Sequence, residues 1–384
     1  MNTSTFRVSA AANEMSTALK SASPRIDSIN VNAYTVPTDF PESDGTIEWT
    51  KTTMVIVEAR ANGAVGIGYT YANPSAAHLV NDQLSKTVEG GDAMDVSGSW
   101  NTMVQSVRNL GRPGLCSMAI SAVDIALWDL KAKLLDLPLV KLLGAVREGI
   151  AVYGSGGFTS YSIEQLQRQL SGWTSSGIRM AKMKIGRNPE EDPHRVRSAR
   201  EAIGKESQLF VDANGAYTRK QALRLSQCFA EENVRWFEEP VSSDDLEGLR
   251  LMRDRAPTYM EIAAGEYGYD ANYFRRMLES GAVDVLQADA TRCGGITGFM
   301  QANALCVAHS MPLSAHTAPS VHLHVCCAAT SAVHLEYFHD HVRIEKMFFD
   351  GAREPVNGDL FPDLTRPGLG IELRRRDVEK YASH

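Results

Sequence analysis

The 384-residue sequence lacks the features that mark several large classes of protein. It contains no run of about 18 apolar residues, so we expect no transmembrane helix and no membrane partner. The 39 lysines and arginines are outnumbered by 46 aspartates and glutamates, and the net charge of -7 argues against a nucleic-acid partner. No GxGxxG turn is present to indicate a dinucleotide site.

Paired-cysteine motifs are also missing. The six cysteines show no CxxC spacing and fall mostly in apolar stretches, which is typical of reduced core residues rather than of a zinc site or a disulfide framework. Residues 1–25 are rich in serine and alanine and lack the continuous apolar segment of a secretory signal. We therefore expect a flexible N-terminal tail over residues 1–25 and a cytoplasmic protein.

Residues 26–149 contain strand-like segments followed by helical ones. Apolar and β-branched residues favour strands at 26–36, 50–61 and 63–71, with Asn-Gly at 62–63 as a hairpin turn. The polar segment 38–49 between the first two strands is expected to be an exposed loop. A helical pattern ends the region at 118–144. This order predicts an α+β domain.

After Gly149 the pattern changes to regular alternation. Eight short apolar segments between residues 150 and 349 are separated by helix-length or glycine-punctuated stretches. This alternation predicts a parallel (β/α) barrel, with an open doubly wound sheet as the structural alternative. Residues 350–384 return to loops rich in proline and glycine with a short strand at 370–375, and we expect them to pack against the N-terminal domain.

Ionisable or polar side chains end seven successive predicted barrel strands. They are Lys182 with Lys184, Asp212 with Asn214, Glu238, Glu266, Asp289, His316 and Glu336. One such residue is more often a helix cap or a solvated charge. Seven in series, at the barrel rim where this fold carries out chemistry, indicate an active site instead.

Three of these strand ends predict a metal site. Asp212, Glu238 and Glu266 follow neighbouring strands, and three carboxylates cannot share a cavity without a cation. Ligation by oxygen alone favours a hard ion, Mg²⁺ first and Mn²⁺ second. A metal there would oppose the two lysines, which alternate onto one face of their strand, across a site built to hold an anion.

Six short motifs together resemble the mandelate racemase group of the enolase superfamily. They are KMK at 182–184, VDAN at 211–214, FEEP at 237–240, AGE at 264–266, DATRCGG at 289–295 and SAH at 314–316. The resemblance extends over essentially the whole chain after Ile26. It implies a modified TIM barrel, (β/α)7β, with an α+β capping domain, one catalytic Mg²⁺ and abstraction of a proton α to a carboxylate.

The resemblance also implies roles for individual residues. Lys184 is expected to be the base on one face of the substrate, and Lys182 to lower the pKa of Lys184 and contact the substrate carboxylate. His316 with Asp289 is expected to form the base on the opposite face. The expected metal ligands are Asp212, Glu238 and Glu266.

Four further residues are expected to contact the substrate or its intermediate. By resemblance, Glu336 hydrogen-bonds to the carboxylate as it becomes an enediolate, and Asn214 meets the α-hydroxyl. Tyr153 and Ser155, at the end of the first barrel strand, are candidates for substrate contact. Among the other histidines, we expect packing or surface positions for His322 and His324, and a surface loop at 339–341.

The same residues serve several reactions of an enediolate. Dehydration of a sugar acid to a 2-keto-3-deoxy acid is favoured, because segment 38–49 carries acidic residues that suit a polyhydroxylated small-molecule carboxylate: Asp39, Glu42, Asp44 and Glu48. A racemase or epimerase, or a cycloisomerase of a 2-hydroxy acid or acid-sugar lactone, is the alternative. A non-catalytic metal-binding barrel is the alternative of another class. Relatives commonly assemble, so we expect a homo-oligomer.

Overall fold

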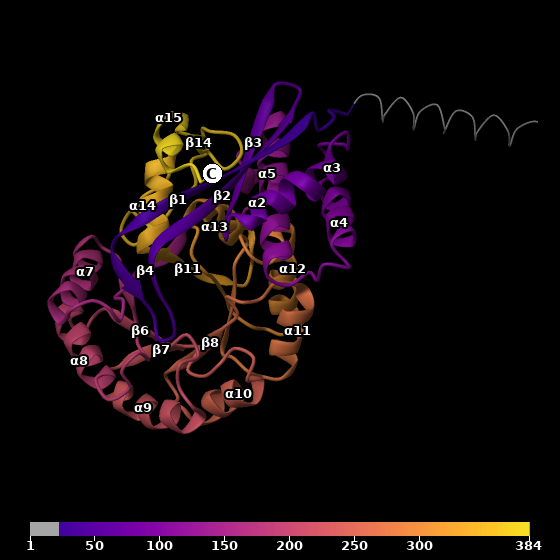
Figure 1. Ribbon diagram of the computed structural model, residues 1–384. Helices are drawn as coiled ribbons and strands as arrows, with labels where there is room; N and C mark the ends of the chain where they lie inside the picture. Colours follow the sequence, from indigo (N-terminus) through magenta and orange to yellow (C-terminus); the bar gives the residue numbers. More distant parts are fainter. Residues whose placement is uncertain (1–22, 384) are drawn as a thin grey trace, which may run out of the picture.

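A computed structural model describes residues 23–383 and shows a closed parallel barrel (Figure 1). Eight strands pair in sequence order, and the last closes on the first through the register Glu336↔Tyr153. The strands are β4 (Ile150–Gly156), β5 (Met180–Lys184), β6 (Gln208–Asp212), β7 (Val234–Glu238), β8 (Glu261–Ala264), β9 (Val285–Ala288), β10 (Leu313–Ala315) and β11 (Ala332–Phe338). These are the eight predicted segments, and the open-sheet alternative is wrong.

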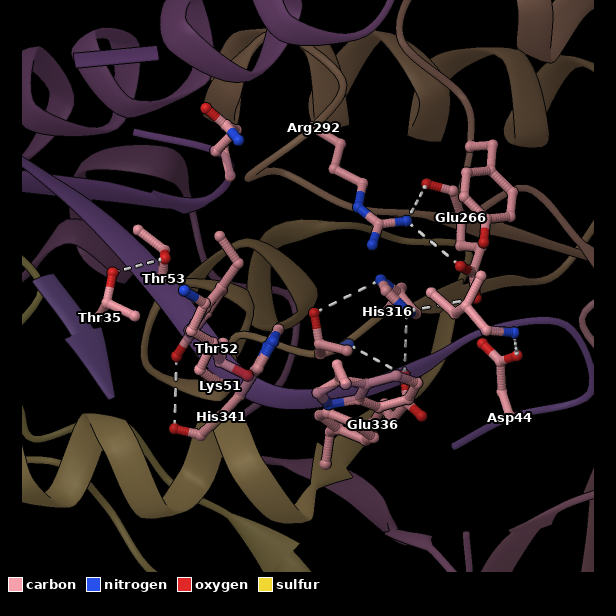
Figure 2. Close-up of a pocket in the computed structure, with 18 of the residues that line it drawn as sticks. Thr35, Asp44, Lys51, Thr52, Thr53, Glu266, Arg292, His316, Glu336 and His341 are labelled. Carbon is pink, nitrogen blue, oxygen red and sulfur yellow. Dashed lines mark hydrogen bonds and ion pairs between the residues drawn. The ribbon is translucent and has the colours of Figure 1, made fainter. Parts of the chain in front are cut away.

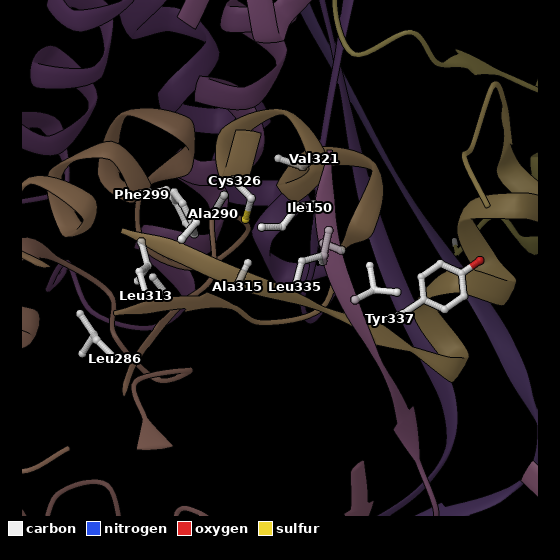
Figure 3. Packing of buried hydrophobic residues seen from close by; sticks show 14 of the residues in the cluster. Ile150, Leu286, Ala290, Phe299, Leu313, Ala315, Val321, Cys326, Leu335 and Tyr337 are labelled. Atoms are coloured by element: carbon white, nitrogen blue, oxygen red, sulfur yellow. The ribbon is translucent and has the colours of Figure 1, made fainter. Parts of the chain in front are cut away.

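Helices surround the barrel because each connection between parallel strands must cross back along the outside. They are α7 (Ile163–Ser175), α8 (Asp192–Ile203), α9 (Arg219–Glu231), α10 (Leu246–Arg255), α11 (Ala271–Glu279), α12 (Gly295–Ala308), α13 (Pro319–Ala328) and α14 (His339–Phe348). Figure 3 shows Leu313 of β10 and Leu335 of β11 packed among the apolar side chains of α12 and α13. The outward strand residues form this core, so the alternate residues point into the barrel.

The N-terminal part forms a separate layer above the barrel. Its antiparallel sheet is packed against helix α5, and residues 135–138 interrupt the predicted helix 118–144. The strands are β1 (Ser28–Ser43), β2 (Glu48–Ala61) and β3 (Ala64–Tyr71). The helices are α2 (Ser75–Leu79), the π-helical η1 (Val80–Leu84), α3 (Ser85–Val88), α4 (Val96–Ser106), α5 (Leu115–Leu134) and α6 (Leu139–Leu143).

Segment 38–49 is not the exposed loop that its polarity predicted. Strands β1 and β2 continue through it as a hairpin, which we call the arm, and the arm crosses the mouth of the barrel (Figure 1). At its tip, a Cβ on Gly45 would lie 2.5 Å from the Ala213 carbonyl oxygen and 2.7 Å from that of Ile185. The arm therefore rests directly on the ends of β5 and β6. This tertiary contact, rather than local sequence, stabilises its polar strands.

The C-terminal segment contacts both layers. Strand β13 (Asp359–Leu360) pairs with β4, and β14 (Glu372–Leu373) pairs with β12 (Phe349–Asp350). Helix α15 (Arg375–Val378) and the 3₁₀ turn η2 (Glu379–Tyr381) follow, and the Ser383 amide donates to the Ala33 carbonyl of β1 at 2.9 Å.

Two sequence-based expectations concern the chain as a whole. Residues 1–22 of the expected N-terminal tail lie outside the described residues. Arg25, also expected in the tail, forms an isolated antiparallel β-bridge with Asp92 through its backbone. No helix within residues 23–383 is long and apolar enough to cross a membrane.

The contact between β3 and α5 generates a stability prediction. A Cβ on Gly68 would lie 2.2 Å from the Ala122 carbonyl oxygen and 2.3 Å from the Ala126 nitrogen, and both are backbone atoms. Gly68→Ala should therefore lower the free energy of unfolding by about 1–3 kcal/mol, measured by denaturant titration. Gly172→Ala is the matched control, because Gly172 lies in helix α7 and a Cβ added to it would have no neighbouring atom within 4 Å. Equal losses in both variants would contradict the packing described.

Candidate active site

The alternation of β5 directs both lysines into the barrel. Met183 and Ile185 lie in the outer core, while Lys182 and Lys184 point inward and are 0% and 5% exposed. In the strand register, Lys184 lies opposite Asp212. The paired amines are therefore not on a solvated edge strand, because the strand is central in a closed barrel.

Three carboxylates meet next to these amines. One oxygen from each of Asp212, Glu238 and Glu266 lies within 4.8 Å of the others, and all three residues are buried. Glu266 Oε2 accepts no hydrogen bond, although His316 Nε2 is 3.3 Å away. Oxygen ligands alone, buried and convergent, match what Mg²⁺ requires of a protein. The three predicted ligands thus fit a hard divalent cation.

Lys182 lies deepest among the carboxylates. Its Nζ is 2.7 Å from Glu238 Oε1, 2.9 Å from Glu336 Oε1 and 3.4 Å from Asp212 Oδ2. Burial lowers the pKa of Lys182, but these carboxylates raise it well above its ordinary value. Lys182 is therefore held as a cation.

Lys184 forms an ion pair with Asp212 Oδ2. Burial is the largest single effect and lowers the pKa of Lys184, but Asp212, Glu266 and Glu238 together raise it more, so the net pKa lies above the ordinary value. Lys182 does lower the pKa of Lys184, as expected, but this smaller effect is outweighed. The expected effect of Lys182 is thus present, while the surrounding carboxylates keep the net pKa of Lys184 above its ordinary value.

His316 is oriented from behind by a carboxylate. Its Nδ1 lies 2.9 Å from Asp289 Oδ2, and the other Asp289 oxygen accepts hydrogen bonds from the Thr291 amide and hydroxyl, both at 2.7 Å. His316 Nε2 consequently faces Glu266 Oε2 at 3.3 Å and Glu336 Oε2 at 3.7 Å. Burial is the largest single effect and lowers the pKa of His316, but Glu266, Asp289 and Glu336 together raise it more, so the net shift is upward.

A cavity of about 680 Å³ opens above these groups (Figure 2). The barrel contributes Lys184, Glu266, Arg292, His316 and Glu336 to its walls. The arm and the neighbouring sheet supply the roof, with Asp44, Ile47, Trp49, Lys51, Thr52 and Thr53. Of the residues predicted to share one rim, Lys184, Glu266, His316 and Glu336 therefore line this cavity.

Four residues predicted to contact the substrate do not line this cavity: Lys182, Tyr153, Ser155 and Asn214. Tyr153 is completely buried in the barrel floor beside Phe210 and Trp236, so its assignment is wrong. Ser155 is also buried and donates its hydroxyl to Glu336, so it positions that carboxylate instead. Asn214 donates its backbone N–H to Asp212 Oδ1 at 2.9 Å, and its side-chain oxygen is buried without a hydrogen-bond partner among the described residues. Its role with an α-hydroxyl stays a prediction.

Arg292 is a site residue that the sequence motif contained without a role. Its Nη1 lies 3.2 Å from Glu266 Oε1 and 3.1 Å from the Glu266 carbonyl oxygen. Its guanidinium lies over the ring of Tyr267, 5.3 Å from the ring centroid. It holds Glu266 in place and adds a positive charge to the cavity wall (Figure 2).

His341 was expected in a surface loop, yet it is buried and lines the cavity. Helix α14 begins at His339, directly after β11, and stacks the His341 ring on Tyr71. The four-residue spacing of the buried Ile344 and Phe348 is the helical signal that identifies this segment.

His322 and His324 occupy packing positions, as expected. His322 Nδ1 donates to the Thr317 carbonyl at 2.7 Å, and its Nε2 accepts from the Ala290 amide at 2.8 Å. His324 Nε2 lies 3.1 Å from the Leu369 carbonyl oxygen.

A capped barrel whose strand ends bring together three carboxylates, two lysines and a His–Asp pair has the architecture of the enolase superfamily. Family models agree with this class. The mandelate racemase/muconate lactonizing enzyme N-terminal domain matches residues 29–144, and the enolase C-terminal domain-like family matches residues 165–378. The chain belongs to the mandelate racemase/muconate lactonizing enzyme group.

Two characterised relatives are similar over most of their length. An L-talarate/galactarate dehydratase of Salmonella typhimurium is 32% identical over 361 residues, covering 91% of this chain and 89% of that protein. A 3,6-anhydro-α-L-galactonate cycloisomerase of Streptomyces coelicolor is 32% identical over 359 residues, covering 91% and 97%.

Solved structures give the same result. A mandelate racemase/muconate lactonizing enzyme-like protein from Rubrobacter xylanophilus is 55% identical with a TM-score of 0.92, covering 94% of this chain and 100% of that one. The L-talarate dehydratase from Polaromonas sp. JS666, complexed with Mg and L-glucarate, is 30% identical with a TM-score of 0.85, covering 94% and 98%.

The carboxylate cluster predicts that Mg²⁺ stabilises the fold. At a free concentration of 100 times its Kd, an ion that binds only the folded chain adds about 2.7 kcal/mol to the free energy of unfolding. Thermal unfolding with and without Mg²⁺ should show this gain in the wild type and lose most of it in Glu266→Gln. Glu261→Gln, at the exposed opposite end of β8, is the matched control and should keep it. The same Mg²⁺ response in Glu266→Gln as in the control would exclude Glu266 as a ligand.

Proposed function

We propose that the chain is a Mg²⁺-dependent lyase that dehydrates a sugar acid to a 2-keto-3-deoxy acid. One observation carries this proposal: a triad of convergent carboxylates adjoins a cavity into which both Lys184 and the Asp289-oriented His316 project. Two relatives with dehydratase names support the reaction type, and one of them was crystallised with Mg and L-glucarate.

The chemical difficulty is the α-proton, which is a very weak acid because its removal places a second negative charge on the carboxylate group. When bound by Asp212, Glu238 and Glu266, Mg²⁺ supplies positive charge that stabilises an enediolate and offsets the carboxylates that raise the pKa of Lys184. Lys182 contributes a fixed cation to the same end of the substrate. Interactions that become stronger as negative charge develops on the substrate lower the barrier to removal of the α-proton.

Lys184 and His316 have different tasks in this proposal. In the order of barrel strands, β4 and β11 separate β5 from β10, so the two side chains reach the cavity from different parts of the wall. Lys184 takes the α-proton. His316 Nε2 gives a proton to the β-hydroxyl, which leaves as water, and the resulting enol converts to the 2-keto acid. Asp289 keeps His316 in the orientation for this transfer.

The cavity lining supports a polyhydroxylated substrate, although for a different reason than the sequence indicated. Of the four acidic residues in segment 38–49, only Asp44 lines the cavity. Asp39 pairs with His339 and Glu48 with Arg187. The hydroxyl and amide groups that suit a sugar acid come instead from Thr35, Thr52 and Thr53 of the sheet and from Asn73 in the loop after β3.

A cycloisomerase is the second candidate function. It is favoured by the relative of that name, which is as similar in identity and coverage as the dehydratase relative. The same enediolate serves both reactions, and the product distinguishes them. A homo-oligomer and a cytoplasmic location stay predictions.

Incubation with a panel of aldonic and aldaric acids tests the reaction. We expect formation of a 2-keto acid from at least one of them, and a decrease in kcat/KM of at least about 10²-fold in both Lys184→Ala and His316→Asn. His309→Ala, at an exposed position, is the control and should keep full activity. Exchange of the α-proton in D₂O without any 2-keto acid would instead support a racemase, and a panel-wide absence of exchange with Mg²⁺ bound would support the non-catalytic barrel.

The Asp289–His316 contact generates a separate prediction. Asp289→Asn keeps the shape of the side chain but presents an amide N–H to His316 Nδ1, which then favours the wrong tautomer. We expect kcat to fall by at least about 10²-fold with little change in the melting temperature. Unchanged kcat would show that the contact is structural only.

A further inference from the structure

A second group of metal-binding side chains lies outside the cavity, where the arm crosses the start of α14. One ligand atom from each of Asp39, Glu42 and His339 lies within 4.8 Å of the others. His339 Nε2 is 3.0 Å from Asp39 Oδ2. None of the three residues lines the cavity described above.

Glu42 is the informative member of this group. Its side chain is fully buried, with 0% exposure, and its Oε2 accepts a hydrogen bond from Trp49 Nε1 at 2.9 Å. The other oxygen, Oε1, is buried and has no hydrogen-bond partner among the described residues. A carboxylate oxygen left without a partner inside a protein is costly, so a ligand that satisfies it would stabilise the arm.

The charges around Glu42 leave room for one more cation. Asp340 is also buried, and its oxygens are taken by the Thr52 hydroxyl and by Arg343 Nη2 at 2.5 Å. Arg343 Nη2 also donates to the Pro37 carbonyl at 2.7 Å. Arg343 is thus already paired with Asp340, and Glu42 has no ion-pair partner among the described residues.

We propose that Asp39, Glu42 and His339 bind a transition-metal dication, with Zn²⁺ as the best match, at a site separate from the Mg²⁺ cluster. An imidazole with two carboxylates is a ligand set that suits Zn²⁺, whereas Mg²⁺ takes oxygen ligands. The side chains of Asp39 and His339 are 36% and 26% exposed, so the ion has a path from solvent and room for a water ligand.

The position of this site gives the ion a role. Asp39 and Glu42 belong to the arm, and His339 follows β11 of the barrel, so a bound ion links the cavity roof to the barrel wall. The arm already contacts the barrel there through aromatic rings and hydrogen bonds: Trp49 meets Phe158 at 5.6 Å, and the Thr159 amide donates to the Ser43 carbonyl at 2.8 Å. The ion would hold the arm closed over the cavity.

Equilibrium dialysis of the full chain against Zn²⁺, in excess Mg²⁺ and followed by metal analysis, tests the proposal. Loss of a mere supporting partner of a metal ligand lowers affinity by about 10- to 100-fold, so loss of a ligand should cost at least about tenfold. We expect this loss in His339→Ala and in Glu42→Gln, which keeps an acceptor for Trp49. His194→Ala, at an exposed helical position, is the matched control and should bind Zn²⁺ as the wild type does. Zn²⁺ should also slow hydrogen exchange of the backbone amides of residues 38–47 in the wild type and in His194→Ala, but not in His339→Ala or Glu42→Gln.

Two results would overturn the proposal. Equal Zn²⁺ binding by the wild type, His339→Ala and Glu42→Gln would place the ion elsewhere, the Mg²⁺ cluster included. Absence of Zn²⁺ binding in the wild type, together with a higher melting temperature for Glu42→Gln, would show that Glu42 carries only a proton. Melting temperatures of all variants establish that each is folded.

Discussion

Carboxylates held out of water at one end of the barrel need positive charge close by, and this constraint shapes the rest of the site. Asp212, Glu238 and Glu266 lie next to one another with Glu336 near them, and all four are buried. Lys182 and Lys184 lie between them, and Arg292 holds Glu266 from the side. Such a cluster stabilises a fold poorly but is well suited to bind a divalent cation and a negatively charged intermediate.

The fold positions this cluster by backbone geometry. Because parallel strands in a closed barrel end at one rim, residues some 20 to 30 positions apart in the sequence become neighbours. The aromatic floor formed by Tyr153, Phe210 and Trp236 closes the barrel below the charges, and the arm closes the cavity above. Water is thereby limited on both sides, which strengthens each electrostatic contact within.

Much of this arrangement could be predicted from the sequence, because strand alternation and the rim of a barrel follow from local patterns. Lys184, Asp212 and His316 were placed correctly for that reason. The arm could not be predicted, since its polar strands depend on the contact of Gly45 with β5 and β6. The position of a residue along a strand also does not show how deep its side chain lies in the barrel. Tyr153, expected to contact the substrate, lies in the floor for this reason. The net pKa of Lys184 depends on its distance from Asp212, which no pattern gives.

The central claim is that one divalent ion is held by Asp212, Glu238 and Glu266. Anomalous diffraction from crystals soaked in Mn²⁺, used as a visible substitute for Mg²⁺, tests this most directly. We expect a single strong peak within the barrel, about 2.1–2.2 Å from one oxygen of each of the three carboxylates. A barrel that shows no peak at this position, or a peak that one of the three carboxylates does not reach, would contradict the claim.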